Sequence, residues 1–219
     1  MFTAGIVTSS AAIDWAMSEL LANPPVLRKL QAELNVVVGR DRDVETSDIP
    51  QLPYLGAVLK ETFRKHPPAA LLVPHMSIDK CKVGGYDIPK GTTVFVNAWA
   101  MGHDPNVWKD EEKFIPERFL VGHHNSMDHV TWKGQHFELL PFGSGRRMCP
   151  GMTLAMPMVE LTVSSLVHAF DKWELVLPVG HDSLDMSDEC GLTCHRVNPL
   201  LALPRRAQSR LNCETSTLT

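Results

Sequence analysis

The feature that most constrains the fold is a glycine-rich segment with one cysteine, which directly precedes a long amphipathic stretch. The segment covers residues 142–151 and holds Cys149 close to Arg146 and Arg147. A cysteine at the start of a helix lies near unpaired backbone N–H groups and the positive end of the helix dipole, which favour the thiolate. Such a thiolate can serve as a nucleophile or a metal ligand, whereas a lone cysteine in a loop is more often a buried structural residue.

The glycines of this segment indicate a close approach by another group. Gly145 and Gly151 have no side chain, so a flat ligand or another backbone segment can lie against them. The residues that follow, 152–170, place apolar side chains at helical spacing. Pro157 lies inside this pattern and removes one helical hydrogen bond, which can kink the helix.

The composition indicates a folded, globular chain. Hydrophobic residues make up 44% of the 219 residues, which is inconsistent with disorder. The net charge of −4 gives no basic excess for binding a nucleic acid or an anionic membrane. The longest uncharged apolar runs, such as residues 69–73, are too short to span a bilayer.

Cysteine usage favours a reducing, cytosol-facing environment. The count of five is odd and the density is low, so a framework of disulfides is not expected. Cys190 and Cys194 could pair or bind a metal, but their spacing is not Cys-x-x-Cys. We therefore predict two free thiols at these positions.

Hydrophobic periodicity predicts a mainly helical α+β fold with small sheets. Helical spacing covers residues 11–21, 27–37, 54–66 and 152–170, and strand-like patterns cover 82–88, 92–96, 173–177 and 197–203. Residues 40–53 and 104–142 are irregular, and 209–219 form a polar tail that we expect to be frayed. We interpret the whole chain, 1–219, as one partial domain.

A histidine-rich stretch lies inside the irregular region. His and carboxylate side chains can bind zinc, but the spacing here matches no compact ligand motif. We therefore favour a solvated loop. The stretch contains His123, His124, Asp128, His129 and His136.

The cysteine segment carries a specific pattern, Phe-x-x-Gly-x-Arg-x-Cys-x-Gly. It is met at Phe142, Gly145, Arg147, Cys149 and Gly151. Five fixed residues at fixed spacing arise by chance on the order of 10⁻⁴ times in a chain of this length. The pattern resembles the haem-binding signature of the cytochromes P450. This resemblance implies that Cys149 is the axial thiolate ligand of a haem b iron, that Arg147 neutralises a haem propionate, and that Phe142 packs near the haem.

Two upstream motifs stand in the order typical of that family. Glu61-Thr62-Phe63-Arg64 places an acid and a base on one helix face, although Glu-x-x-Arg alone is expected about once by chance. Residues 116–119 follow as Pro-Glu-Arg-Phe. The resemblance implies that Glu61, Arg64 and Arg118 form a buried charge triad that locks the cysteine-loop side of the core.

Further segments extend the resemblance to plant microsomal members. Residues 4–9 resemble the oxygen-binding kink of the family's central helix and place Thr8 where a threonine helps to protonate bound oxygen. A helical threonine that bonds back to a backbone carbonyl is the ordinary alternative. Residues 66–75 resemble a segment that lines the substrate pocket. His75 stands where a basic residue contacts a propionate, and a plain loop histidine explains it equally well.

Residues 190–193 resemble the last substrate-facing turn, in a C-terminal hairpin. The resemblance therefore implies several substrate-facing positions. Their mostly apolar character suits a lipophilic small molecule such as a phenylpropanoid, flavonoid or terpenoid. They are Ala4, Ala69, Leu71, Val73 and Thr193.

One residue departs from the family pattern. Val7 precedes Thr8, where most members have an acid that relays protons to oxygen. Three explanations remain open. Water and hydroxyl groups such as that of Ser9 could relay protons, the enzyme could be a haem-dependent isomerase or dehydratase that does not use oxygen, or the chain could be an inactive truncated remnant.

The resemblance covers about the C-terminal half of the family. We expect the membrane anchor and the pocket roof in an N-terminal part that this sequence lacks, and no membrane segment within the chain itself. We also expect cut core surfaces to be exposed, with poor solubility.

For the whole protein the resemblance implies a monooxygenase that inserts one atom of O2 into a lipophilic substrate. It further implies electrons from NADPH through cytochrome P450 reductase, no nucleic-acid partner, and a place on the cytosolic face of the endoplasmic reticulum membrane.

Overall fold

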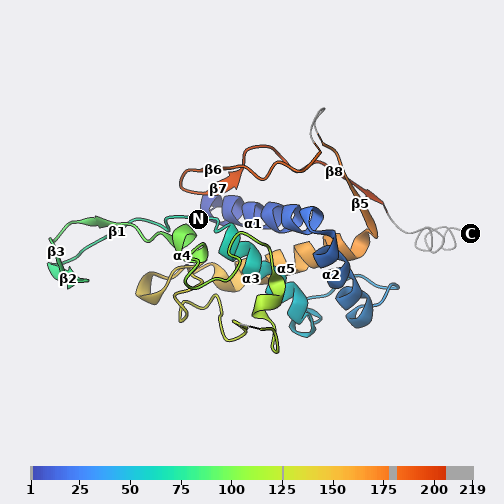
Figure 1. Cartoon of the computed structure of the whole chain (residues 1–219), viewed down its shortest axis with the longest axis horizontal. Helices are drawn as coiled ribbons and strands as arrows, with labels where there is room; N and C mark the ends of the chain where they lie inside the picture. Colours follow the sequence, from blue (N-terminus) through green and yellow to red (C-terminus); the bar gives the residue numbers. More distant parts are fainter. Residues whose placement is uncertain (1, 125, 178–181, 206–219) are drawn as a thin grey trace, which may run out of the picture.

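The computed structural model describes residues 2–124, 126–177 and 182–205. Figure 1 shows α1 running through the middle of the body, with the other long helices beside it. The helices are α1 (Phe2–Ala22), α2 (Pro24–Val37), α3 (Pro53–Lys65), α4 (Ala98–Gly102) and α5 (Met152–Ala169), with the 3-10 turns η1 (Ile49–Gln51), η2 (Pro116–Phe119) and η3 (Gly145–Arg147). The predicted tail, 209–219, lies outside the described residues.

Helix α1 begins earlier than its apolar periodicity predicted. The pattern starts at Ala11 because the face that packs on the core starts there, and residues 4–7 are exposed. Apolar side chains of α1, α2, α3 and α5 then form one core. Its fully buried members include Leu20, Leu30, Leu34, Leu55, Leu59 and Val163.

Helix α5 continues through Pro157, whose ring is exposed. This helix is also long and apolar enough to cross a membrane by length and composition. The core helix of a globular domain passes the same test, and α5 packs against α1, α2 and α3. We therefore interpret α5 as a core helix.

The strands form small antiparallel pairs rather than one large sheet. Within the described residues the pairs are β1 (His75–Met76) with β4 (Thr93–Val94), β2 (Cys81–Val83) with β3 (Tyr86–Ile88), β5 (Lys172–Leu175) with β8 (Ala202–Arg205), and β6 (Asp188–Cys190) with β7 (Cys194–Arg196). The predicted Gly-Gly hairpin is present, because Gly84 and Gly85 take the left-handed conformation that a tight turn needs. Figure 1 shows β2 and β3 at the end of an arm that projects from the body.

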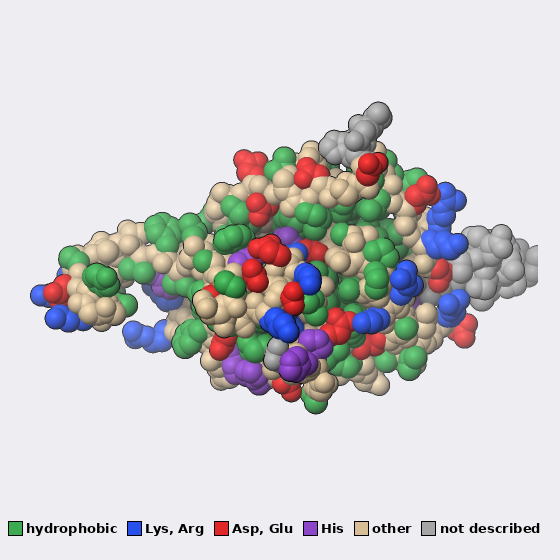
Figure 2. Space-filling model, in the orientation of Figure 1, with side chains coloured by type: hydrophobic (Ala, Val, Ile, Leu, Met, Phe, Trp, Pro, Cys, Tyr) green, Lys and Arg blue, Asp and Glu red, His purple; other side chains and the backbone are tan. Residues whose placement is uncertain are grey.

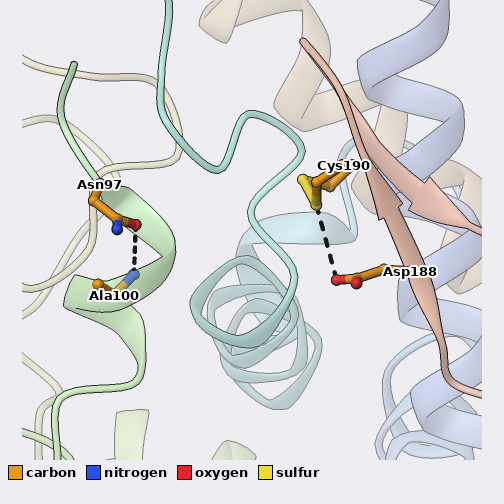
Figure 3. The surroundings of a disulfide bond; sticks show 5 residues. Asn97, Ala100, Asp188 and Cys190 are labelled. Carbon is orange, nitrogen blue, oxygen red and sulfur yellow. Dashed lines mark hydrogen bonds between the residues drawn. A yellow bond between two sulfur atoms is a disulfide. The ribbon is translucent and has the colours of Figure 1, made fainter. Parts of the chain in front are cut away.

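The prediction of free thiols at Cys190 and Cys194 is wrong. The two cysteines form a disulfide, which lies at the end of the β6–β7 hairpin (Figure 3). Cys190 is the register partner of Cys194, because a three-residue turn places positions i and i+4 opposite each other. A spacing of four residues therefore fits a disulfide in a hairpin, although it fits no Cys-x-x-Cys motif. Figure 3 also shows Asn97, which caps the short α4 by accepting a hydrogen bond from the N–H of Ala100 at 2.9 Å.

The loop between α2 and α3 is held by a buried carboxylate. Asp48 accepts two hydrogen bonds from the Arg42 guanidinium, both at 2.7 Å, and one from the backbone N–H of Glu45 at 2.9 Å. The Arg42 bonds, helped by the Glu45 N–H, lower the pKa of Asp48 from 3.8 to about 2. The ionised form is therefore tied to the folded state.

We predict that Asp48→Asn destabilises the chain at neutral pH, with a loss that shrinks in acid. A lowered folded-state pKa contributes stability that is fully present above 3.8 and is lost as the pH falls toward about 2. Urea unfolding over a pH series measures the difference from wild type. Asp41→Asn, at an exposed position nearby, is the control. A difference that stays constant down to the lowest pH would contradict this account.

Candidate functional site

Cys149 lies in a tight loop directly before α5. Its thiol is free and exposed, and its backbone N–H donates to the carbonyl of Phe142 at 2.9 Å. The N–H of Met148 donates to the carbonyl of Gly145 at 3.1 Å. Across the described ranges no hydrogen bond reaches the Cys149 sulfur, so the loop presents this atom to an external group.

Two glycines make this loop conformation accessible. Gly145 has φ +73°, a left-handed value that a side chain would oppose. Gly134 lies against the loop from outside, and a Cβ there would be 2.8 Å from the carbonyl oxygen of Gly143. The Ser144 hydroxyl donates to the Gly134 carbonyl at 2.6 Å. The irregular region before the cysteine segment thus supports the cysteine loop. The lack of periodicity in that region did not reveal this role.

The other residues of the predicted signature differ in their exposure and contacts. The Phe142 ring is half-buried and meets Phe63 of α3 edge-on at 5.9 Å between centroids. Arg147 ends η3 with an exposed side chain. Gly151 is the N-cap residue of α5. A Cβ at Gly151 would meet the Cys149 sulfur at 3.7 Å, an ordinary contact.

The segment 69–73 touches the same loop. Leu72 takes a left-handed conformation with φ +50°, which is uncommon for a residue with a bulky side chain. Its Cδ1 atom lies 3.8 Å from the Cβ position of Gly143. Ala69 is half-buried, whereas Leu71 and Val73 are exposed.

The predicted residues of α1 lie on its first turns. Ala4 and Val7 are exposed, and Thr8 is half-buried. The Thr8 hydroxyl donates to the carbonyl of Ala4, the local bond that a helical threonine makes. Ser9 is buried, and the Ser10 hydroxyl donates to the carbonyl of Val7 at 3.0 Å.

The remaining predicted positions lie on strands and turns. His75 is exposed in β1 opposite Val94. Thr193 is half-buried in the β6–β7 turn. In the histidine-rich stretch, His129 and His136 meet edge-on at 5.5 Å. Among the described residues no group of His, Cys, Asp or Glu side chains is arranged to hold a metal ion.

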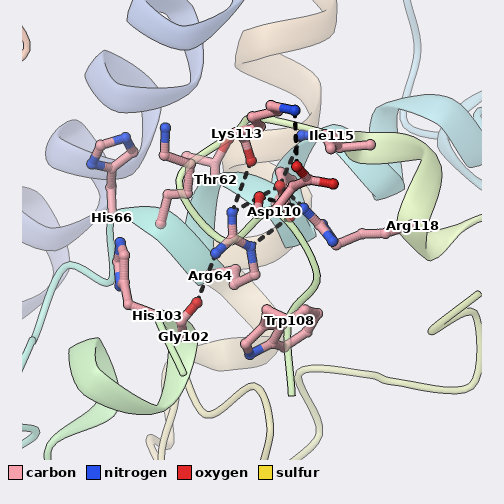
Figure 4. Close-up of polar contacts among 12 residues, drawn as sticks. Thr62, Arg64, His66, Gly102, His103, Trp108, Asp110, Lys113, Ile115 and Arg118 are labelled. Carbon is pink, nitrogen blue, oxygen red and sulfur yellow. Dashed lines mark hydrogen bonds and ion pairs between the residues drawn. The ribbon is translucent and has the colours of Figure 1, made fainter. Parts of the chain in front are cut away.

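Glu61, Arg64 and Arg118 come together in a buried cluster between α3 and η2. Figure 4 shows Arg64 and Arg118 of this cluster pointing toward each other. Arg64 donates to both Glu61 carboxylate oxygens, from Nε at 2.8 Å and from Nη2 at 2.9 Å. Arg118 Nε donates to Glu61 Oε1 at 3.1 Å. The backbone N–H of Ile115 donates to the same oxygen at 2.8 Å. One carboxylate thus joins two elements that lie far apart in the sequence.

Backbone carbonyl groups accept further hydrogen bonds from both guanidiniums. Their acceptors belong to Gly102, Lys109, Asp110 and Lys113, at 2.7–3.3 Å. The Trp108 ring lies near both arginines, 5.5 Å from Arg64 and 5.9 Å from Arg118. A Cβ at Gly102 would lie 2.2 Å from the carbonyl oxygen of Arg64, so this position accepts only glycine without a backbone shift. The sequence motif gave no sign of Trp108 or Gly102.

We predict that Glu61→Ala destabilises the fold by about 3–5 kcal/mol, because it leaves two buried guanidinium groups without a counter-charge. Urea unfolding provides the measurement. Glu174→Ala removes an exposed ion pair with Arg205 and should cost about 0–1 kcal/mol. A loss for Glu61→Ala as small as that of this control would show that the cluster contributes little.

Comparison with known proteins assigns the family. The cytochrome P450 family model matches residues 1–196. The chain belongs to the cytochrome P450 family. Among solved structures, a zebra fish cytochrome P450 described with abiraterone has a TM-score of 0.78 and 35% identity, over 94% of this chain and 46% of that one. The predicted mainly helical α+β class, as a portion of the P450 fold, is confirmed.

Curated plant proteins are more similar in sequence. A flavonoid 3'-monooxygenase of Arabidopsis thaliana is 48% identical over 94% of this chain and 39% of its own length. An iridoid oxidase of Catharanthus roseus is 48% identical over 94% of this chain and 39% of its own length. The chain therefore spans about two fifths of the curated relatives it matches.

Membership of this family implies a haem iron as cofactor, and the residues present fit such a group. The Cys149 thiol is exposed and free at the start of α5. Large apolar side chains are exposed on the first turns of α1, on the 69–73 segment and on the first turns of α5, where a large flat apolar group could cover them. These include Ile6, Leu71, Val73, Leu154 and Met158. Figure 2 shows hydrophobic side chains exposed across the body on one face, interspersed with charged ones.

Proposed function

We propose that this chain is the haem-ligating part of a plant monooxygenase of secondary metabolism, which inserts one atom of O2 into a lipophilic small molecule. The observation that carries the proposal is the free, exposed Cys149 thiol in the cytochrome P450 signature at the start of α5. A haem iron bound there supplies oxygen activation, which a thiolate ligand favours.

The residues of this chain have distinct roles in that proposal. Cys149 provides the thiolate ligand from the loop directly before α5. Arg147 and His75 neutralise propionate groups. Phe142 limits the access of water to the sulfur. The Thr8 hydroxyl, which donates to the Ala4 carbonyl, would hold a proton at its Oγ1 atom and supply it for oxygen activation if a haem iron were bound.

The substrate is proposed to lie against apolar side chains of two segments and one polar side chain of a third. These side chains are Ala4, Ala69, Leu71 and Val73, with the Thr193 hydroxyl as a polar group beside them. Two relatives are named for a flavonoid and an iridoid, which are both lipophilic plant compounds. We propose a substrate of the flavonoid, phenylpropanoid or terpenoid class. Electrons come from NADPH through a reductase on the endoplasmic reticulum, where the whole protein resides.

We predict that the chain loaded with haem gives a thiolate-type Soret band in the ferrous–CO difference spectrum, and that Cys149→Ser abolishes it because a hydroxyl is a poor substitute ligand for the iron. Cys81→Ser, at another exposed free thiol, is the matched control and should keep the band. A band that survives in Cys149→Ser would exclude this cysteine as the ligand. Absence of the band from a folded longer chain that includes upstream sequence would overturn the haem-thiolate proposal.

A second candidate function rests on Val7. Its exposed apolar side chain cannot carry protons to bound oxygen, which favours a haem-dependent isomerase or dehydratase acting on an already oxidised substrate. An inactive remnant explains the same residue.

We predict that Val7→Asp raises oxygen-dependent turnover if the chain acts as a monooxygenase with an impaired proton relay, because the variant restores a proton donor. Turnover of a hydroperoxide, with none from O2 plus reductase in either variant, would favour the isomerase or dehydratase instead. The measurement is product formation by the haem-loaded protein under both conditions.

A further inference from the structure

The β6–β7 hairpin is attached to α1 through one buried arginine. Arg196, the last residue of β7, is 5% exposed. Its Nη1 atom donates to the Ser18 hydroxyl of α1 at 2.7 Å, and its Nη2 atom donates to the carbonyl of Asp185 at 2.7 Å. Its guanidinium lies 6.0 Å from the centre of the Trp15 ring. The Arg196 side chain therefore connects the end of β7, and the backbone just before β6, to α1.

Trp15 is itself fixed by a second set of contacts. Its ring stacks on His66 with 3.8 Å between centroids and 3° between planes. His66 lies at the end of α3 and pairs with the buried Glu19 at 2.7 Å, and Lys65 contacts the same carboxylate oxygen at 3.0 Å. The part of α1 that contacts Arg196 is thus also linked to the end of α3.

The other side of the hairpin touches the 67–73 segment. The backbone N–H of Cys194 donates to the carbonyl of Pro68 at 2.8 Å. The turn that carries Thr193 is closed by the Cys190–Cys194 disulfide, which joins the two strands to each other and not to the body. The hairpin is therefore held on the body by the Cys194–Pro68 bond near its tip and by Arg196 at its base.

We propose that Arg196 is a positioning residue for the substrate-facing turn, because its guanidinium fixes the β6–β7 hairpin on α1 and so sets where Thr193 lies. The substrate-facing role of Thr193 rests on the proposed function, whereas the attachment by Arg196 does not. A planar guanidinium is suited to this task because it donates in two directions and lies over an aromatic ring at the same time. A lysine offers one compact charge and cannot reproduce all three contacts.

The test compares wild type with Arg196→Gln, Arg196→Lys and Ser18→Ala. Arg205→Gln is the matched control, because Arg205 lies on another strand pair with an exposed side chain paired to Glu174. Two measurements need no haem. One is amide hydrogen exchange along the chain. The other is the rate at which a small dithiol reduces the disulfide under native conditions, with two cysteine thiols formed and the dithiol oxidised to its own disulfide.

We expect Arg196→Gln to raise the amide exchange rates at residues 188–196 and the rate of disulfide reduction by about tenfold or more, since it removes buried charge-assisted hydrogen bonds. Arg196→Lys and Ser18→Ala should fall between it and wild type, and Arg205→Gln should match wild type. Exchange in α3 and α5 should stay unchanged. Unchanged rates at the hairpin in Arg196→Gln would overturn the proposal, and so would an equal rise in every element, which marks general destabilisation.

A third measurement separates this proposal from the proposed function. Haem-loaded wild type and Arg196→Gln are given naringenin as a flavonoid probe, and the ratio of hydroxylated products is determined. A changed ratio with an unchanged ferrous–CO band supports the positioning role, and an unchanged ratio counts against it. A missing band in wild type counts against the proposed function, and the two haem-free measurements then decide the role of Arg196.

Discussion

The buried carboxylate of Glu61 is the interaction on which the rest of the structure depends. It neutralises two guanidinium groups that would otherwise be left charged in the interior, one on its own helix and one on η2. Buried ions are tolerated when they are paired and hydrogen-bonded, and here backbone carbonyls within residues 102–113 accept further N–H groups of both guanidiniums. A long stretch without regular secondary structure is thereby fixed to α3. Phe63 of the same helix packs on Phe142, so the cysteine loop rests on the framework that this cluster stabilises.

The cysteine loop and the Glu61–Arg64 pair could be predicted because their motifs encode local geometry, whereas the place of Arg118 in the cluster came from the family resemblance. A glycine with φ +73° and a cysteine at a helix start leave a recognisable sequence pattern, and Glu61 and Arg64 share a face because they are three residues apart. The start of α1 could not be predicted from periodicity, because residues 4–7 of this helix are all exposed. The glycines that allow close packing around the cysteine loop and the charge cluster were missed for a related reason. Gly102 and Gly134 are required by backbone segments distant in sequence, and no local pattern reports such an approach.

The disulfide and Arg196 show the same division between local and distant information. Cysteines four residues apart are ambiguous in a sequence, and the hairpin register resolves them. No sequence pattern marked Arg196, yet its guanidinium bonds a serine 178 positions earlier. Non-local contacts of this kind determine how separate segments are placed around the proposed pocket. The residues that hold a pocket together are consequently harder to find than the residues that line it.

The pairing of α1 with α5 has a consequence for biosynthesis. Helix α1 ends at Ala22, and α5, against which it packs, begins about 130 residues later at Met152. At a synthesis rate of about 5–20 residues per second, the part of the α1 apolar face that packs on α5 waits roughly 6 to 26 seconds before that partner exists. Contacts of such long sequence separation also form slowly once the chain is complete. Part of the apolar surface of α1 is therefore uncovered during translation, and slower decoding ahead of α5 would lengthen the interval in which the chain can aggregate.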